Sequence, residues 1–459
     1  MADAGRLALA DGSHVVCTAT LRELPGKRAV FAGRRDGQEV IVKQYLDPRR
    51  GAVHARREAA GLAAFARAGI AAPPVLYDGS DDEGHAVLVL QRIAAAATFG
   101  EVFHAATVAE RRTLLTQMMR LLAQHHAAGV CQADLHPNNF LLADGRLYSI
   151  DGAAVDAREE ALGEDAALAN VALFCAQFTP DNDALCLDAA PAYLAARGWS
   201  DTLMGRLPAA ISAARDRRWC KLLPKLFREC TAVQHRVRGR REAYVMRDAG
   251  PALAALADDP DASCPSEPAA RLKNGNTATV WRTEVDGAGV VVKRYNVKNP
   301  WHGLQMWFKH SRAAISWRNA HMLDLYGIAT PAPLALVVER RGLFGRRAWF
   351  ISREVAGMPL NAWVDARGGD PGTIAAMAAQ VGHVLAALRV QRISHGDMKA
   401  TNFLVVDDRL YLIDLDAMQR HHNPSRFEHA WRRDLQRFMA NWHDRPDVAA
   451  AMRDAIRVH

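Results

Sequence analysis

Cysteine is scarce in this sequence, and long apolar runs are missing. The seven cysteines are odd in number and scattered, and no two stand in a Cys-x2-Cys arrangement, so we expect neither a disulfide framework nor a zinc site. The first residues place two aspartates around a short apolar run, which is not typical of a signal peptide. No stretch approaches about 18 uninterrupted apolar residues, so no membrane-spanning helix is expected. These absences indicate a cytoplasmic protein that can still contact a membrane surface.

The net charge is also small. The 459 residues include 58 Lys and Arg against 50 Asp and Glu, and the resulting charge of +8 does not by itself indicate nucleic-acid binding. Residues 269–459 are the more basic part, with 27 basic against 17 acidic side chains. Residues 206–241 hold 11 basic and two acidic side chains, but only Trp219 and Phe227 as aromatics, too few to stack on bases. This segment is either a solvated helical face or a surface for an anionic glycolipid or leaflet, and nucleic acid is not an expected partner.

An internal repeat organises the chain. Residues 134–151 and 397–414 share Asp-x4-Asn and a further Asp 17 residues after the first, and every matched position differs by 263 in number. Looser matches lie upstream, in two Gly-Ile-Ala-x-Pro segments and two β-branched runs (69–73 and 327–331, 40–45 and 290–295). Insertions in surface loops would change the spacing between shared elements in this way. We therefore interpret the chain as two copies of one unit.

The repeat predicts two domains with a connection between them. Residues 248–268 contain four prolines and many small or acidic residues, a composition typical of a linker. We expect a first domain at 1–250, a linker at 251–268 and a second domain at 269–459.

Local patterns predict the same order of elements in both copies. Apolar and β-branched runs predict strands at 40–45 and 290–295. Helical spacing predicts a helix after each strand and a longer amphipathic helix before each Asp motif (53–68 and 311–326, 107–128 and 371–390). Asp144-Gly145 predicts a tight hairpin turn. The expected class is α+β, with a small sheet and one helix followed by a helical region that a hairpin interrupts.

Each copy carries residues suited to phosphoryl transfer. Such a reaction needs a cation on the nucleotide phosphates, oxygen ligands for Mg²⁺ and a carboxylate near the attacking hydroxyl. Both copies supply, in one order, a strand Lys, a loop Asp, an Asn and a second Asp (Lys43, Asp134, Asn139 and Asp151; Lys293, Asp397, Asn402 and Asp414). Ordinary Asx-rich turns would explain one such motif, but duplication at fixed spacing argues against them.

This order resembles the protein-kinase-like superfamily, with its strand Lys, His-x-Asp-x4-Asn and Asp-Phe-Gly. Within it, the Gly-Ile-x-x-Pro, Asn-Phe-Leu and Arg-Leu-Tyr-x-Ile-Asp segments look like the lipopolysaccharide core (heptose or Kdo) kinase family, over residues 25–245 and 270–445. The resemblance implies two tandem protein-kinase-like domains, each with a small β-rich N-lobe and a mainly helical C-lobe. It also implies an enzyme of Gram-negative bacteria that uses ATP and Mg²⁺ to phosphorylate a sugar hydroxyl, foremost of heptose, in the lipopolysaccharide inner core.

The resemblance assigns roles to the repeated residues. Asp134 and Asp397 match the catalytic base, and Lys43 and Lys293 match the lysine that binds nucleotide phosphates. The magnesium ligands would be Asn139, Asp151, Asn402 and Asp414. Glu58 is a candidate partner of Lys43, although a solvated helix residue is an equal alternative.

Both copies depart from the family pattern. Gln132 stands where the His of His-x-Asp is expected, and an amide there could hydrogen-bond to the loop backbone. In the second copy, alignment through Gly-Ile places Ser316 opposite Glu58. The partner of Lys293 therefore cannot be read from the sequence.

Three functions remain open. After Asp414 only 45 residues follow, and neither copy has an Ala-Pro-Glu motif, so a small or glycolipid acceptor fits better than a protein. The leading hypothesis is a cytoplasmic kinase, peripheral at the anionic inner membrane, whose acceptor is the lipopolysaccharide core glycolipid, with the second copy as the main catalyst. One alternative is a pseudokinase scaffold or binding module in one or both copies. The other is a phosphotransferase for another small molecule, which would need an acidic pocket for a cationic substrate.

Overall fold

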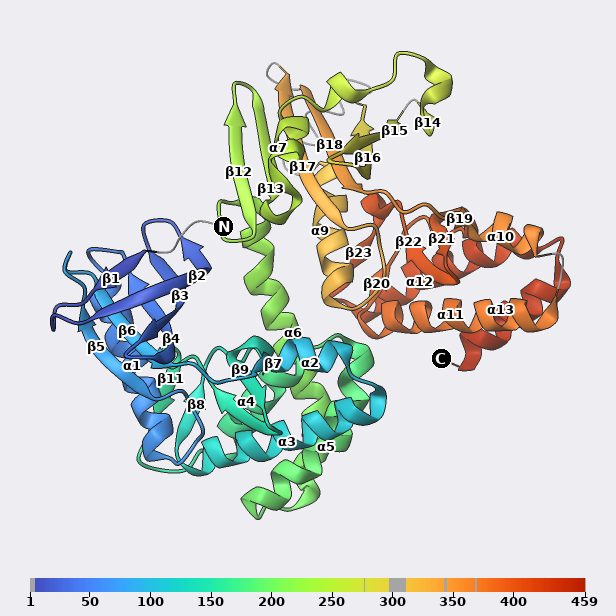
Figure 1. Cartoon of the computed structure of the whole chain (residues 1–459). Helices are drawn as coiled ribbons and strands as arrows, with labels where there is room; N and C mark the ends of the chain where they lie inside the picture. The colour runs from blue at the N-terminus through green and yellow to red at the C-terminus, as the bar shows by residue number, and fades with distance from the viewer. Residues whose placement is uncertain (1–4, 276, 297–310, 342–344, 368–369, 459) are drawn as a thin grey trace. The chain divides into compact units, whose positions relative to one another are not determined.

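The computed structural model describes residues 5–275, 277–296, 311–341, 345–367 and 370–458. They form an α+β fold that divides into two compact units, Met1–Arg217 and Arg218–His459, called unit 1 and unit 2 below (Figure 1). Each unit has an antiparallel sheet followed by a helical region that contains two small sheets.

The large sheet of unit 1 is six-stranded, in the order β1-β2-β3-β4-β6-β5. Its strands are β1 (Arg6–Ala8), β2 (His14–Leu24), β3 (Arg28–Arg35), β4 (Gln38–Tyr45), β5 (Val75–Ser80) and β6 (Ala86–Gln91). Successive side chains of a strand point to opposite faces. In β4, Val40 and Val42 are buried in an apolar cluster on one face, while Tyr45 packs against Ala55 of helix α1 (Gly51–Arg67) on the other. This alternation places Lys43 on the face that α1 covers.

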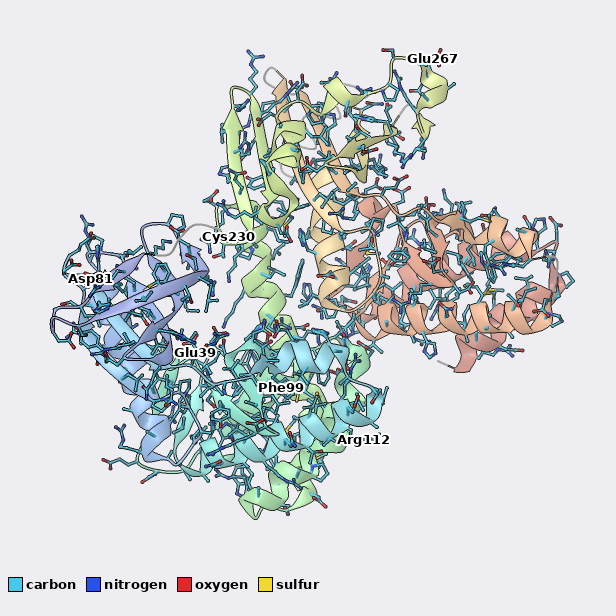
Figure 2. The ribbon with its side chains drawn as sticks, in the orientation of Figure 1. Glu39, Asp81, Phe99, Arg112, Cys230 and Glu267 are labelled. Carbon is cyan, nitrogen blue, oxygen red and sulfur yellow. The ribbon has the colours of Figure 1, made fainter. Side chains whose placement is uncertain are left out.

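The helical region of unit 1 consists mainly of α-helices. It contains α2 (Phe99–Ala105), α3 (Val108–Ala127), α4 (Glu164–Cys175), α5 (Asp183–Arg197) and the first part of α6 (Leu207–Leu222), which continues past Arg217 into unit 2. Two small sheets, β7 (Ala97–Thr98) with β9 (Phe140–Ala143) and β10 (Arg146–Ser149), and β8 (Val130–Gln132) with β11 (Val155–Ala157), complete it. Phe99, labelled in Figure 2, is fully buried at the start of α2, and Thr98 and Thr107 close capping boxes at the start of α2 and α3.

The sheet of unit 2 has the order β12-β13-β17-β18-β16-β15-β14. Its strands are β12 (Val233–Arg238), β13 (Arg241–Met246), β14 (Lys273–Asn274), β15 (Ala278–Val285), β16 (Ala288–Tyr295), β17 (Pro333–Arg341) and β18 (Gly345–Arg353). Helix α9 (Arg312–Leu325) lies against β16, β17 and β18, as α1 lies against β4 and β6 in unit 1. Lys43 and Lys293 even have equivalent cross-strand partners, Val30 and Val280.

The predicted boundary and linker at 251–268 are wrong. Residues 241–245 of β13 pair with residues 335–339 of β17, so the hairpin β12–β13 belongs to the sheet of unit 2. Helix α7 (Gly250–Asp258) follows and buries Leu253, Ala254 and Ala257 with residues of that sheet. Small residues and a proline at a helix start resemble a linker in composition, yet here they pack.

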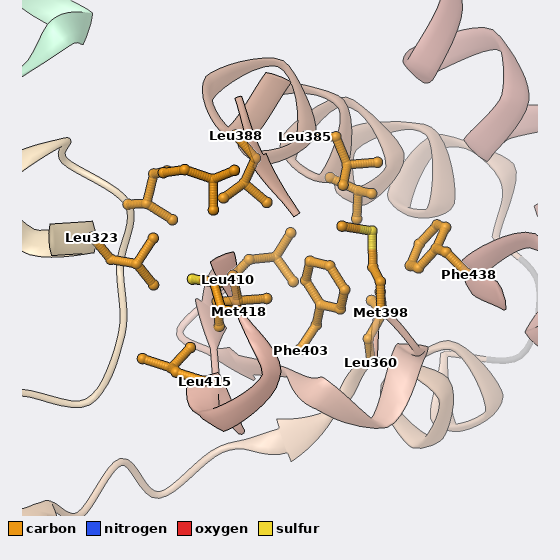
Figure 3. Close-up of a cluster of buried hydrophobic side chains, with 14 of the residues drawn as sticks. Leu323, Leu360, Leu385, Leu388, Met398, Phe403, Leu410, Leu415, Met418 and Phe438 are labelled. Carbon is orange, nitrogen blue, oxygen red and sulfur yellow. The ribbon is translucent and has the colours of Figure 1, made fainter. Parts of the chain in front are cut away.

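The helical region of unit 2 contains α10 (Leu360–Ala366), α11 (Pro371–Val390), α12 (Pro424–Met439) and α13 (Pro446–Val458). Its small sheets are β19 (Met358–Pro359) with β21 (Phe403–Val406) and β22 (Arg409–Leu412), and β20 (Ile393–Ser394) with β23 (Gln419–Arg420). Among the described residues, α11 is the one helix long and apolar enough by composition to cross a membrane. Its apolar face is occupied within the unit, since Leu385 and Leu388 lie in one cluster with Phe403 and Phe438 (Figure 3).

The predicted elements are confirmed. The strands lie in β4 and β16, the shorter helices in α1 and α9, and the longer helices in α3 and α11. Asp144 and Gly145 both have positive φ, as a type I′ hairpin requires, and Asp407 and Asp408 adopt the same conformation in the second copy.

Two glycines let helix α1 touch the segment that follows β10. A Cβ on Gly61 would collide with the carbonyl oxygen of Gly152, and one on Gly152 would collide with that of Glu58. The close approach of these backbones therefore depends on glycine at both positions.

Replacement Gly61→Ala is expected to lower the free energy of unfolding of unit 1 by about 1–3 kcal/mol, because the new methyl group overpacks this contact. Gly205→Ala is the control, since nothing lies within 4 Å of its Cβ position. It should change stability by less than about 0.5 kcal/mol. Urea unfolding measures both, and equal midpoints for the two variants would contradict the inferred contact.

Candidate active site

The four predicted side chains of unit 1 come together where the sheet meets the helical region. Lys43 Nζ lies 3.4 Å from the carbonyl oxygen of Ile150, the neighbour of Asp151. Asn139 Nδ2 donates to the carbonyl oxygen of Asp134 at 2.8 Å, and the Ile150 N–H donates to the carbonyl oxygen of Asn139 at 3.0 Å. One chain of contacts thus joins the strand lysine, the Asp loop and the end of the hairpin.

Unit 2 repeats this arrangement. Asn402 Nδ2 donates to the carbonyl oxygen of Asp397 at 2.7 Å, and the Ile413 N–H donates to the carbonyl oxygen of Asn402 at 2.9 Å. Lys293 Nζ contacts the carboxylate of Asp414 directly. The structure therefore brings together the repeated Lys, Asp, Asn and Asp of both copies.

Glu58 is the partner of Lys43. The two form an ion pair, and Glu58 is 0% exposed, so the alternative of a solvated helix residue is wrong. The hydroxyl of Tyr45 also donates to Glu58 Oε2 at 3.3 Å. Burial, and then the Glu58 carboxylate, raise the pKa of Tyr45, which keeps its hydroxyl a donor.

In unit 2 a second acid lies near Lys293, and it was not identified from the sequence. Lys293 Nζ lies 2.9 Å from Asp416 Oδ2, in addition to its contact with Asp414. Burial alone would lower the pKa of Lys293, but Tyr295, Asp414 and Asp416 outweigh it and raise the pKa. Ser316 occupies the place of Glu58, as the alignment predicted, because its Oγ lies 2.9 Å from the Tyr295 hydroxyl. The position of Asp416, two residues after Asp414 in the sequence, was the one signal for this acid.

The two Asp loops are supported by different side chains. In unit 2, His395 Nε2 donates to the carbonyl oxygen of Ile413 at 3.0 Å. In unit 1, Gln132 Nε2 donates to the carbonyl oxygen of Asp151 at 3.0 Å. The amide thus ties the loop to the hairpin end as the imidazole does, which confirms the reading of Gln132 as a loop support.

The carboxylate of Asp397 lies between two cations. Arg437 Nη1 is 2.9 Å from Oδ1, and Lys399 Nζ is 3.1 Å from Oδ2. Partial burial alone would raise the pKa of Asp397, but Lys399 and Arg437 outweigh it, so the pKa lies below its ordinary value. Asp134 of unit 1 is exposed, and His136 takes the place of Lys399 there.

Both sites offer oxygen ligands of the kind that Mg²⁺ prefers. Each Asn uses its N–H group on the main chain of the Asp loop, which leaves its side-chain oxygen for a ligand. Asp151 and Asp414 add carboxylate oxygens at the hairpin ends. Within the described parts of the chain, no group of three or more His, Cys, Asp or Glu could hold a metal ion. Such a sparse donor set fits an ion that is held partly by substrate phosphates.

Comparison with known proteins decides the family. The model of the lipopolysaccharide kinase (Kdo/WaaP) family matches residues 27–156 and 266–458, which together exceed half of the chain. The chain belongs to this family. The two matched segments contain all nine predicted site residues, and two segments are consistent with a tandem arrangement. A lipopolysaccharide kinase is a phosphotransferase, so this class of reaction follows from the membership.

A solved structure is similar to part of this chain. The structure "WaaP in complex with acyl carrier protein" is 21% identical, covers 43% of this chain and 87% of its own, and has a TM-score of 0.32. No curated protein matches the chain.

The cations around Asp397 predict a pH effect. If Asp397 accepts the proton of the acceptor hydroxyl, unit 2 is active only at pH values above the pKa of Asp397. Arg437→Leu removes one cation, so the pKa should rise and the acidic limb of kcat/KM should move to higher pH. The profile is measured in an Asp134→Asn background, with Arg432→Leu on the same helix as the control. An unmoved acidic limb would show that Arg437 does not tune this carboxylate.

Proposed function

We propose that this kinase transfers the γ-phosphoryl group of ATP to a sugar hydroxyl, foremost of heptose, in the lipopolysaccharide inner core. The observation that carries the proposal is the duplicated set of Lys, Asp, Asn and Asp, joined by contacts in each unit of a lipopolysaccharide kinase. Each unit is then a protein-kinase-like domain, with its sheet as N-lobe and its helices as C-lobe.

In unit 1, Lys43 binds the nucleotide phosphates while Glu58 holds it in place. Asn139 and Asp151 would hold Mg²⁺, which neutralises charge on the phosphates when it is bound. Asp134 accepts the proton of the sugar hydroxyl as the new bond to phosphorus forms and the bond to the leaving ADP breaks. Lys293, Asn402, Asp414 and Asp397 have the same roles in unit 2.

The charges of the units favour an anionic acceptor. With the observed boundary, unit 1 has 22 Lys and Arg against 26 Asp and Glu, a net −4, and unit 2 has 36 against 24, a net +12. A basic unit suits a phosphorylated or acidic glycolipid and peripheral contact with the anionic inner membrane from the cytoplasm. It argues against a cationic small molecule as substrate.

The basic segment 206–241 contributes less to this than its sequence indicates. It runs through α6 and the 3₁₀ turn η4 (Leu223–Phe227) into β12, so it is not one helical face. Several of its cations are paired with acids: Arg215 with Asp183, Arg236 and Arg238 with Asp258, and Arg241 with Asp259 and Glu339. These ion pairs offset part of the positive charge that the segment carries.

A second candidate function is a binding role for one unit. The observation that favours it is the different environment of the lysine, since the helix that follows it carries Glu58 in unit 1 and Ser316 in unit 2. A unit with a displaced lysine would bind without transferring phosphate.

Asp134→Asn and Asp397→Asn, separately and together, test the proposal. Loss of a catalytic base is expected to lower kcat about 10²- to 10⁴-fold. Mass spectrometry of lipopolysaccharide from cells without a redundant kinase should show the core phosphate lost in the double variant. A single variant that loses it alone identifies the working unit.

Matched controls are available beside both sites. Asp144→Asn and Asp407→Asn make the same change in the hairpin turns, where Asn tolerates positive φ. They should leave core phosphate unchanged. Normal core phosphate in the Asp134→Asn, Asp397→Asn double variant would exclude the proposed function.

A further inference from the structure

The two units supply the acid for their lysine from different elements. In unit 1 the acid is Glu58, on the helix that follows the lysine strand. In unit 2 the equivalent helix position is Ser316, and Asp416 pairs with Lys293 from the 3₁₀ turn η9 (Leu415–Ala417) instead. The position of unit 1 that matches Asp416 is Ala153. Compared with unit 1, unit 2 thus lacks the acid on the helix and has one on the loop.

The packing between helix and loop changes at the same places. Gly61 and Gly152 touch through their backbones in unit 1. Their matches in unit 2 are Asn319 and Leu415, and Asn319 Nδ2 donates to the carbonyl oxygens of Leu415 and Met418, both at 2.9 Å. Side-chain hydrogen bonds therefore replace the direct backbone contact, and the acid on the loop accompanies this change.

The buried carboxylate of Asp416 is bound by two cationic side chains. Its side chain is 5% exposed, and both of its oxygens accept from Arg312 Nη2, at 3.0 and 2.9 Å. Lys293 Nζ and the Arg312 guanidinium also lie over the ring of Tyr295, 4.9 and 5.3 Å from its centre. A buried charge with these partners is stable, and removal of the carboxylate would leave two cations without it.

We infer that Asp416 is the positioning residue of unit 2, which holds Lys293 for the nucleotide as Glu58 holds Lys43 in unit 1. The inference rests on the proposed function. Asp414 also contacts Lys293, but under the proposed function its carboxylate would hold the metal ion. With Asp416 present, Lys293 keeps an anionic partner when Asp414 binds the metal ion. Absence of the helix glutamate therefore does not disable unit 2.

A double-mutant cycle on Lys293 and Asp416 tests this inference. The parent chain carries Lys43→Met, so that MgATP binding measured by calorimetry reports mainly on unit 2. Asp416→Asn keeps the size of the side chain and is expected to weaken ATP binding about tenfold or more. Lys293→Met should weaken it at least as much. The double variant should bind ATP no more weakly than Lys293→Met alone, because the acid then has no lysine to position.

A merely structural role of Asp416 gives another result. With such a role, the losses of ATP affinity in Asp416→Asn and Lys293→Met would multiply in the double variant, and this outcome would overturn the inference. Unchanged ATP binding in Asp416→Asn would overturn it too. Asp407→Asn, on the hairpin turn of the same unit, is the control and should bind ATP as the parent does. No acceptor is present in this titration, so the acceptor does not affect the result. A wild-type chain that binds no ATP would contradict the proposed function itself. A Lys43→Met parent that binds none, or binding that ignores Asp416, contradicts only the inference.

Discussion

A buried ion pair between a strand lysine and a carboxylate is the interaction on which each unit depends. Removing an ammonium and a carboxylate from water costs several kcal/mol per ion, and only close pairing offsets this cost. The side chain of Lys43 is 13% exposed and that of Glu58 0%, while Lys293 is 16% and Asp416 5% exposed. The pair in unit 1 therefore requires the sheet and helix α1 to lie together, and the pair in unit 2 requires the sheet and the loop after the hairpin to do so.

The two units meet this requirement with different residues. Unit 1 brings the helix close through two glycines, and the acid comes from the helix. Unit 2 has Asn319 at the contact, and its acid comes from the loop with Arg312 beside it. Tyr45 and Tyr295 bond to the helix side chain in both cases. In both units a carboxylate thus lies at the lysine, although it comes from the helix in one unit and from the loop in the other.

Much of this architecture was predictable from the sequence, and the exceptions have a physical reason. The strands, helices and Asp motifs are local patterns that occur twice, so the prediction for each copy supported the prediction for the other. The pairing of β13 with β17 joins residues 98 apart at Arg241 and Glu339, and Asp416 meets Lys293 from 123 residues away. No local pattern encodes such contacts. The segment 251–268 had the composition of a linker, and only its packing on the sheet reveals that α7 belongs to unit 2.

The corrected boundary also changes how the charge is understood. Moving residues 218–268 into unit 2 gives the units net charges of −4 and +12, a sharper contrast than the sequence division indicated. The contrast continues at the two loop aspartates, since Asp397 has Lys399 and Arg437 beside it, whereas His136 follows the exposed Asp134. Two sites with similar donor sets therefore differ in the charge around them. Under the proposed function, an acceptor that carries phosphate or acidic sugars would be attracted by the surroundings of Asp397, which favours unit 2 as the catalyst.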